Sequence, residues 1–257
     1  MISMKKQVLH DLGASGNDMD ALLEYTKNVF QPKVELTKDE ELSPNWQVMW
    51  ERVKNVCKNA PNLEMFPSVA GVIPIVFPED TGDFEHILRE IVYKNKDVPN
   101  LTNMGASFVS GKTLRFIVLS DKPYSGIPAE EIGLSDSAWA AKSLVIRKYH
   151  ECAHYYTKRF LGSSRNNLHD ELIADFCGIY AAFDEYKAAY FLKFFRNRLE
   201  LYTKDLSASA AEVIYTLAES AALGIESWSK TPEFRKLNET QRIDHLAGKE
   251  LLAYLIK

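Results

Sequence analysis

The sequence has few cysteines, glycines and prolines, and neither sign of charge dominates it. Its 257 residues include 3 Cys, 12 Gly and 10 Pro, with 31 Lys and Arg against 35 Asp and Glu, for a formal net charge of −4. So little glycine and proline excludes collagen-like and low-complexity chains. The near balance of charge excludes a general polyanion-binding role, so we expect no nucleic-acid partner.

The sequence also lacks the marks of a secreted or membrane protein. Cys57, Cys152 and Cys177 are an odd number at unrelated spacings, which is typical of a reducing compartment and not of a disulfide framework. The longest apolar run, Gly71 to Phe77, is interrupted by Pro74, and no apolar stretch follows the first lysines. We therefore expect a cytoplasmic protein with no membrane partner.

The chain does contain enough apolar residues for a large core. Hydrophobic residues make up 46% of it and aromatic residues 11%, so a chain of this length can bury a sizeable core. We predict a single compact unit, residues 1–257, with two lobes. The first lobe, 1–134, is expected to hold N-terminal helices and a small sheet, and the second, 135–257, is expected to be helical and to carry the chemistry.

Two types of hydrophobic pattern divide the first lobe. Apolar residues recur at helical spacing over 17–30 and 42–59, whereas 65–78 is rich in β-branched and aromatic residues and is predicted to be extended. A short helix is expected over 83–95. Residues 104–120 form two β-rich runs separated by Ser-Gly-Lys, a turn of hairpin length, which predicts a small antiparallel sheet.

The rest of the chain is predicted to be helical from residue 136 onward. Cap and stop residues predict the breaks between helices. These breaks lie near Gly162, Asp184, residues 205–207, residues 231–232 and Asn238. The predicted fold class is therefore α+β and mostly helical, with the small antiparallel sheet packed before a long helix and a C-terminal helical bundle after it.

That long helix, predicted over 137–161, carries an HExxH motif. His150 and His154 are four residues apart, and Glu151 follows the first of them. Side chains four apart lie one above the other on a helix, so both imidazoles can reach a single metal ion. Glu151 lies about 100° round the helix, where its carboxylate can reach a metal-bound water. We predict two metal ligands, His150 and His154, and a general base, Glu151.

A second acidic pair follows on the next predicted helix, which Asn167 can cap. Glu171 and Asp175 share one face of that helix. A catalytic zinc takes three protein ligands, and two His with one Glu is a known set. We therefore predict Glu171 as the third ligand, with His169 and Asp170 as the alternatives. Asp175 is predicted to accept a hydrogen bond from the far nitrogen of a zinc-bound imidazole.

The two motifs together, HExxH at 150–154 and ExxxD at 171–175, resemble the gluzincin class of zinc metallopeptidases, which contains thermolysin-like and aminopeptidase-like enzymes. The resemblance covers about residues 137–183. It implies a Zn²⁺ cofactor and a small sheet before the metal helix, in which an edge strand holds an extended substrate by backbone pairing. Residues 104–120 occupy the corresponding place in the sequence.

Two differences from known zinc peptidase motifs limit which enzymes the chain resembles. The longer metzincin motif HExxHxxGxxH is absent, because Thr157 and Phe160 stand in place of its Gly and third His. The run Gly-Ala-Ser at 105–107 is similar to the start of the Gly-Ala-Met-Glu-Asn strand of zinc aminopeptidases. However, Phe108 and Val109 stand in place of the Glu and Asn. The carboxylate that anchors a substrate amine is therefore missing.

The sequence thus predicts a zinc-dependent metallopeptidase that acts on a peptide or protein substrate. Glu151 would take a proton from the zinc-activated water and pass it to the departing amine. The donor that stabilises the oxyanion is not identified. Four residues lie in segments that could face the cleft: Tyr124, Arg165, His169 and Tyr180. Residues 121–135 form a connection long enough to cover that cleft.

Two other interpretations of the motif stay open. In one, the chain is a regulatory or interaction protein that binds a metal on a metallopeptidase-like scaffold and catalyses nothing. In the other, no metal binds, and the two histidines are ordinary residues of a helix surface, with Glu151 paired to Arg147 or Lys148. A glutamate beside the first histidine favours catalysis, since binding alone does not need it.

Overall fold

The structure is a computed structural model, which describes residues 2–34, 46–94, 96, 101, 104–110, 115–163 and 167–255. By its internal contacts the chain divides into two compact units. One consists of Met1–Pro32 with Leu161–Lys257, and the other is Lys33–Phe160. The predicted division into lobes 1–134 and 135–257 of a single compact unit stays a prediction.

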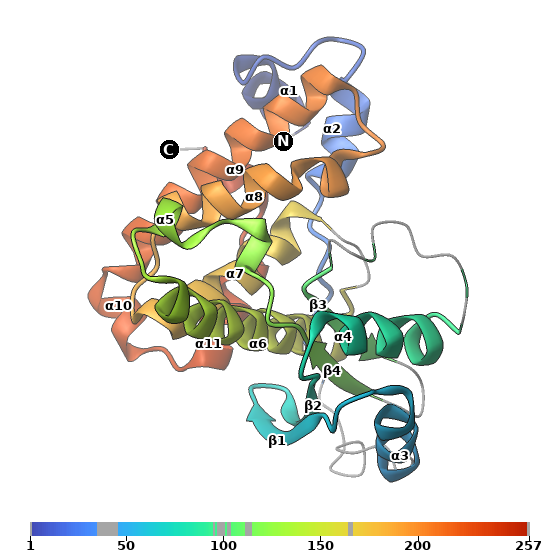
Figure 1. Ribbon diagram of the computed structural model, residues 1–257. Coiled ribbons are helices and arrows are strands. Elements are labelled where there is room, and N and C mark those ends of the chain that lie inside the picture. Colours follow the sequence, from blue (N-terminus) through green and yellow to red (C-terminus); the bar gives the residue numbers. More distant parts are fainter. Residues whose placement is uncertain are drawn as a thin grey trace. The chain divides into compact units, whose positions relative to one another are not determined.

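The unit Lys33–Phe160 holds the sheet and the helix of the HExxH motif (Figure 1). Its elements in chain order are α3 (Trp46–Val56), β1 (Asn62–Ser68), β2 (Gly71–Phe77), α4 (Thr81–Ile87), the π-helical turn η2 (Leu88–Val92), β3 (Ala106–Ser110), β4 (Arg115–Leu119), the 3₁₀ turn η4 (Tyr124–Gly126), α5 (Ala129–Ile132) and α6 (Asp136–Phe160). The segment predicted to be extended over 65–78 is a hairpin, because the chain turns at residues 69–70.

The four strands form one sheet in the order β1-β2-β4-β3. The hairpins β1–β2 and β3–β4 are antiparallel, whereas β2 and β4 pair in parallel. The sheet is therefore mixed, because the two hairpins join side by side through their second strands. The prediction of a small antiparallel sheet was right for each hairpin. The parallel pairing of β2 with β4 was not predicted. The predicted turn at 110–112 lies almost wholly outside the described residues.

The two faces of the sheet pack against different helices. On one face, Val76, Phe116 and Val118 lie in a core cluster with residues of α3, α4 and η2. On the other face, Phe108 contacts Tyr155 of α6, with ring centroids 5.4 Å apart. This packing follows from the alternation of side chains along a strand. It places α6 against β3 and β4, so the sheet supports the helix that carries the histidines.

The unit formed by Met1–Pro32 and Leu161–Lys257 is helical. Its elements are α1 (Ile2–Asp11), α2 (Met19–Tyr25), α7 (Leu168–Phe183), α8 (Ala188–Thr203), α9 (Ala208–Ser229), α10 (Pro232–Lys236), α11 (Glu239–Gly248) and the 3₁₀ turn η5 (Leu251–Tyr254). Helix α1 was not predicted from the sequence. Within this unit α7 contacts α8, α9 and α11, so its side chains are buried along most of its length.

The helix boundaries follow the cap residues that the sequence contains. The side chains of Asn167, Ser207, Thr231 and Asn238 each accept a hydrogen bond from a backbone N–H at the start of α7, α9, α10 and α11. Gly162, just after α6, has a φ of 62°, which favours glycine and stops a helix. The prediction of an α+β, mostly helical fold is confirmed. None of the helices in the described part of the chain is both long and apolar enough to cross a membrane.

Candidate metal centre

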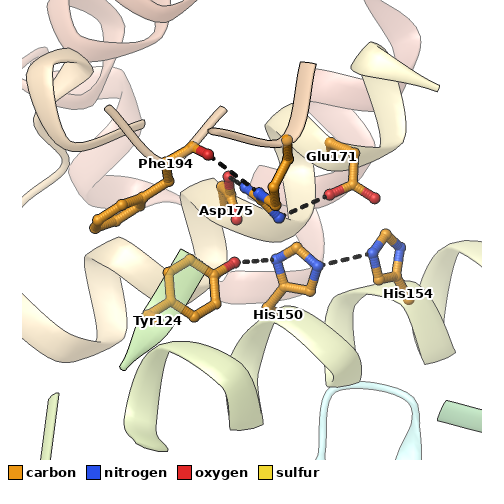
Figure 2. A network of polar contacts seen from close by, with 7 residues as sticks. Tyr124, His150, His154, Glu171, Asp175 and Phe194 are labelled. Atoms are coloured by element: carbon orange, nitrogen blue, oxygen red, sulfur yellow. Dashed lines mark hydrogen bonds and ion pairs between the residues drawn. The ribbon is translucent and has the colours of Figure 1, made fainter. Parts of the chain in front are cut away.

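Helix α6 brings the two histidines of the motif together. It runs without glycine or proline from Asp136 to Phe160, so the side chains at positions 150 and 154 lie on one face. The Nε2 atoms of His150 and His154 are 3.0 Å apart, and the rings are close to perpendicular, at 80° (Figure 2). His150 is buried and His154 is half-buried. The two ring nitrogens therefore lie on one side of the helix, within hydrogen-bond distance of each other.

The other ring nitrogen of His150 has a partner from the segment before α5. Its Nδ1 lies 2.9 Å from the hydroxyl oxygen of Tyr124 (Figure 2). From the sequence, Tyr124 was a candidate only for the oxyanion donor. No sequence signal could have assigned it to His150, because the two residues are 26 positions apart.

Glu151, the predicted general base, is half-buried on α6. It lies close enough to Arg147, one turn earlier on the helix, for the two charges to attract each other. Burial lowers the pKa of the Arg147 guanidinium to about 10, and Tyr124, Asp121 and Glu151 oppose this shift. The guanidinium therefore stays protonated at neutral pH. The role of Glu151 in proton transfer stays a prediction.

Helix α7 carries Glu171 and Asp175, both almost completely buried. Arg198 of α8 binds both carboxylates: its Nη1 donates to Oε2 of Glu171 at 3.2 Å, and its Nη2 pairs with Oδ2 of Asp175 (Figure 2). Burial raises the pKa of Tyr202, and the charge of Glu171 and a hydrogen bond to it raise this pKa further. The Tyr202 hydroxyl therefore stays protonated and donates to Glu171. Neither of these two partners of Glu171 was predicted from the sequence.

Replacement of Arg198 by methionine is expected to lower the free energy of unfolding by about 3 kcal/mol in the absence of metal, because two buried carboxylates lose their shared cation. The matched control is Arg196→Met on the same helix. Its partner Glu212 is exposed, so this change should cost less than about 1 kcal/mol. Urea denaturation with a chelator present measures both. Equal stability of the two variants would contradict the buried ion pair.

The alternatives to Glu171 as third ligand are engaged elsewhere in their unit. The Nε2 of His169 donates to the carbonyl oxygen of Leu246 at 2.9 Å, and burial lowers the pKa of His169. Asp170 accepts a hydrogen bond from the Ser163 hydroxyl at 2.9 Å. Each of the two side chains therefore has a hydrogen-bond partner within its own unit.

Two further candidates for the oxyanion donor gain no support. Tyr180 packs among Phe176, Phe234 and Arg242 in the helical core. Arg165 lies outside the described residues. Among those of the four residues that the structure describes, Tyr124 has a hydrogen bond to His150, a predicted ligand.

Three side chains in the described part of the chain form a group that could hold a metal ion: His150, His154 and Glu171. One ring nitrogen from each histidine and one carboxylate oxygen all lie within 4.8 Å of one another. Two imidazoles and one carboxylate are a donor set that zinc accepts, so the chemistry of these side chains fits the ion. The predicted hydrogen bond from a histidine imidazole to the carboxylate of Asp175 stays a prediction.

Comparison with known proteins places the chain in a family. The model of DUF7005, a family of unknown function, matches residues 56–114 and 113–254. The chain belongs to this family. The matched ranges of DUF7005 contain the sheet, α6 and α7, and so all the residues of the candidate metal centre.

Two further comparisons found no relatives. No curated protein matches the chain, and no solved structure matches it. Because the function of DUF7005 is unknown, a function for this chain has to come from its own residues.

Proposed function

We propose that this chain is a zinc-dependent metallopeptidase that hydrolyses peptide bonds in a peptide or protein substrate. The observation that carries the proposal is the His150, His154 and Glu171 group, with Glu151 next to the first histidine on the same helix. Two histidines and one glutamate form a ligand set of catalytic zinc sites, because they leave a fourth position open.

The residues around the ligands favour a preorganised centre. The carboxylate of Glu171 is held by Arg198 and Tyr202, and the imidazole of His150 is held by Tyr124. Hydrogen bonds of this kind orient the ligands before a metal arrives. An exposed histidine pair on an ordinary helix surface does not need such partners, which favours the metal centre over the accidental motif.

The proposed mechanism assigns proton transfer to Glu151. A bound zinc ion supplies Lewis-acid chemistry, since it polarises a carbonyl and lowers the pKa of water. Glu151 accepts the proton of the attacking water and donates it to the departing amine. A half-buried glutamate suits both steps, because it is accessible to water while its charge is balanced by the nearby Arg147.

The sheet offers a place for an extended substrate. Strand β3 is at one end of the strand order and, in the described part of the sheet, pairs with β4 alone. Its outer edge can therefore form backbone hydrogen bonds with a peptide. Contact of β3 with α6 puts this edge strand beside the helix of the histidines. We propose that the substrate binds along β3.

The proposal includes a cytoplasmic location and no nucleic-acid or membrane partner. The three cysteines are free thiols, and two of them are buried. Free thiols in a chain of this size fit a reducing compartment.

Removal of the metal tests the proposal directly. We expect the protein purified without added metal to contain about one zinc per chain and to cleave an unstructured protein such as casein. A chelator should abolish cleavage, and an equimolar amount of zinc should restore it, because the ion supplies the Lewis acid. Metal analysis and the release of fluorescent peptides measure the two quantities. Cleavage that survives complete removal of zinc would contradict the proposal.

A further inference from the structure

The segment that carries Tyr124 is attached to α6 at several points along one face. Ser143 and Arg147 are four residues apart, and His150 follows three residues later, so the three side chains lie on the same side of the helix. The Ser143 hydroxyl accepts a hydrogen bond from the backbone N–H of Tyr124 at 3.1 Å. Helix α6 therefore binds the backbone of Tyr124 about two turns before His150.

Arg147 binds the chain on both sides of this point. Its guanidinium donates to the carbonyl oxygens of Ser120 at 3.2 Å and Pro123 at 2.9 Å. The side chain is only 4% exposed, so these hydrogen bonds are shielded from water. They fix the path of the chain just before Tyr124.

The absence of a side chain at Gly105 makes room for this guanidinium. A Cβ atom at position 105 would lie 2.6 Å from Nε and 2.8 Å from Nη2 of Arg147. The carbonyl oxygen of Gly105 also accepts hydrogen bonds from the backbone N–H and the hydroxyl of Ser120. Contacts of Gly105, Ser120 and Arg147 therefore join the start of β3, the end of β4 and α6 close to Tyr124.

The far side of the segment is attached as well. The indole Nε1 of Trp139 donates to the carbonyl oxygen of Ile127 at 2.7 Å. Ser125 has a φ of 53°, a left-handed conformation that a serine adopts only where its surroundings hold it. The tyrosine is thus placed by a backbone fixed before and after it.

The result of this placement is the contact between the Tyr124 hydroxyl and Nδ1 of His150, at 2.9 Å. A neutral imidazole carries one proton, on either Nδ1 or Nε2. Nε2 of His150 faces Nε2 of His154, and it can bind a metal only if it carries no proton. The proton must then be on Nδ1, from which it is donated to the Tyr124 oxygen.

We propose that Tyr124 is a positioning residue of the metal centre: its hydroxyl accepts the Nδ1 proton of His150 and so holds the imidazole in the tautomer and orientation that direct Nε2 towards the ion. This inference rests on the proposed metal centre. Tyr124 acts through His150 and contacts no reacting atom. The role that acidic residues or carbonyl groups commonly have beside zinc-bound histidines belongs here to a phenol.

The test is Tyr124→Phe, which removes one oxygen atom and keeps the ring. We expect the zinc dissociation constant, measured by competition with a chromophoric chelator, to rise about 10- to 100-fold. The matched control is Tyr93→Phe in the same unit. Its hydroxyl contacts the Met104 sulfur at 3.9 Å, so its removal should leave zinc affinity unchanged.

A second measurement separates positioning from a general loss of structure. In the zinc-free protein, histidine ¹⁵N NMR should show His150 with its proton on Nδ1 in the wild type and in Tyr93→Phe. Tyr124→Phe should show a mixture of both tautomers, because the acceptor is gone. Unchanged circular dichroism of the variant would establish that the fold is retained.

Ser143→Ala provides a variant that leaves the tyrosine itself intact. Loss of the acceptor for the Tyr124 backbone N–H should loosen the segment, and we expect zinc affinity to fall in the same direction as in Tyr124→Phe but less. This variant keeps the inference testable if Tyr124→Phe does not fold.

The outcomes are distinguishable. A wild type that binds zinc beside a Tyr124→Phe variant of equal affinity and unchanged tautomer would overturn the role of Tyr124 and leave the metal centre intact. A wild type that binds no zinc would refute the metal centre itself and, with it, this inference. Weaker zinc binding together with mixed tautomers would establish both.

Discussion

Glu151→Gln is expected to keep its zinc and to lose peptide hydrolysis by a factor of about 100 to 10,000, the usual contribution of a general acid or base. The amide has the size of the carboxylate but cannot accept the proton of the attacking water. The proposed ligands His150, His154 and Glu171 are untouched, so metal binding should not change. Zinc content by metal analysis and the rate of casein cleavage measure the two effects.

The control for this variant is Glu130→Gln, an exposed glutamate of α5 in the same unit. It should retain both zinc and activity. Full cleavage by Glu151→Gln would exclude Glu151 as the base. A wild type that binds zinc tightly but cleaves no substrate would favour the alternative function, a metal-binding regulatory or interaction protein.

Glu171→Ala is expected to weaken zinc binding more than about 100-fold. Loss of a residue that only hydrogen-bonds to a ligand already lowers metal affinity about 10- to 100-fold, and loss of a ligand should lower it further. Loss of one of three protein ligands leaves the ion with two imidazoles. The fold should survive, because Arg198 keeps its pair with Asp175. The measurement is zinc content after dialysis against a weak chelator, together with the dissociation constant.

The control here is Asp170→Asn, which alters the neighbouring acid on α7, one of the two alternative ligands. Asp170 accepts a hydrogen bond from Ser163, and the amide oxygen of asparagine can accept the same bond. This variant should therefore keep its zinc. Equal zinc content in Glu171→Ala and the wild type would remove Glu171 from the ligand set.

The predictions from sequence succeeded where a single element decides the geometry. The helix period puts His150 and His154 on one face whatever the rest of the chain does, and the structure shows their ring nitrogens 3.0 Å apart. The cap residues Asn167, Ser207 and Asn238 likewise mark helix starts by local chemistry. Each of these features depends on residues within about one helical turn.

The predictions were incomplete where distant segments meet. The sheet joins two hairpins through the parallel pair β2 and β4, and a pattern of alternating residues indicates strands without indicating their neighbours. The partners of Glu171 were missed for the same reason. Arg198 is 27 residues away from it on another helix, and one arginine among many carries no sign of its partner.

By itself, the sequence determined most of the helices and strands, their caps and the spacing of the HExxH motif, because these depend on backbone periodicity and on residues close together along the chain. Only the tertiary structure shows that Tyr124 is a partner of His150 and that Arg198 pairs with Glu171 and Asp175. Those pairings depend on how whole elements pack, since burial and side-chain reach between distant segments have no local pattern in the sequence.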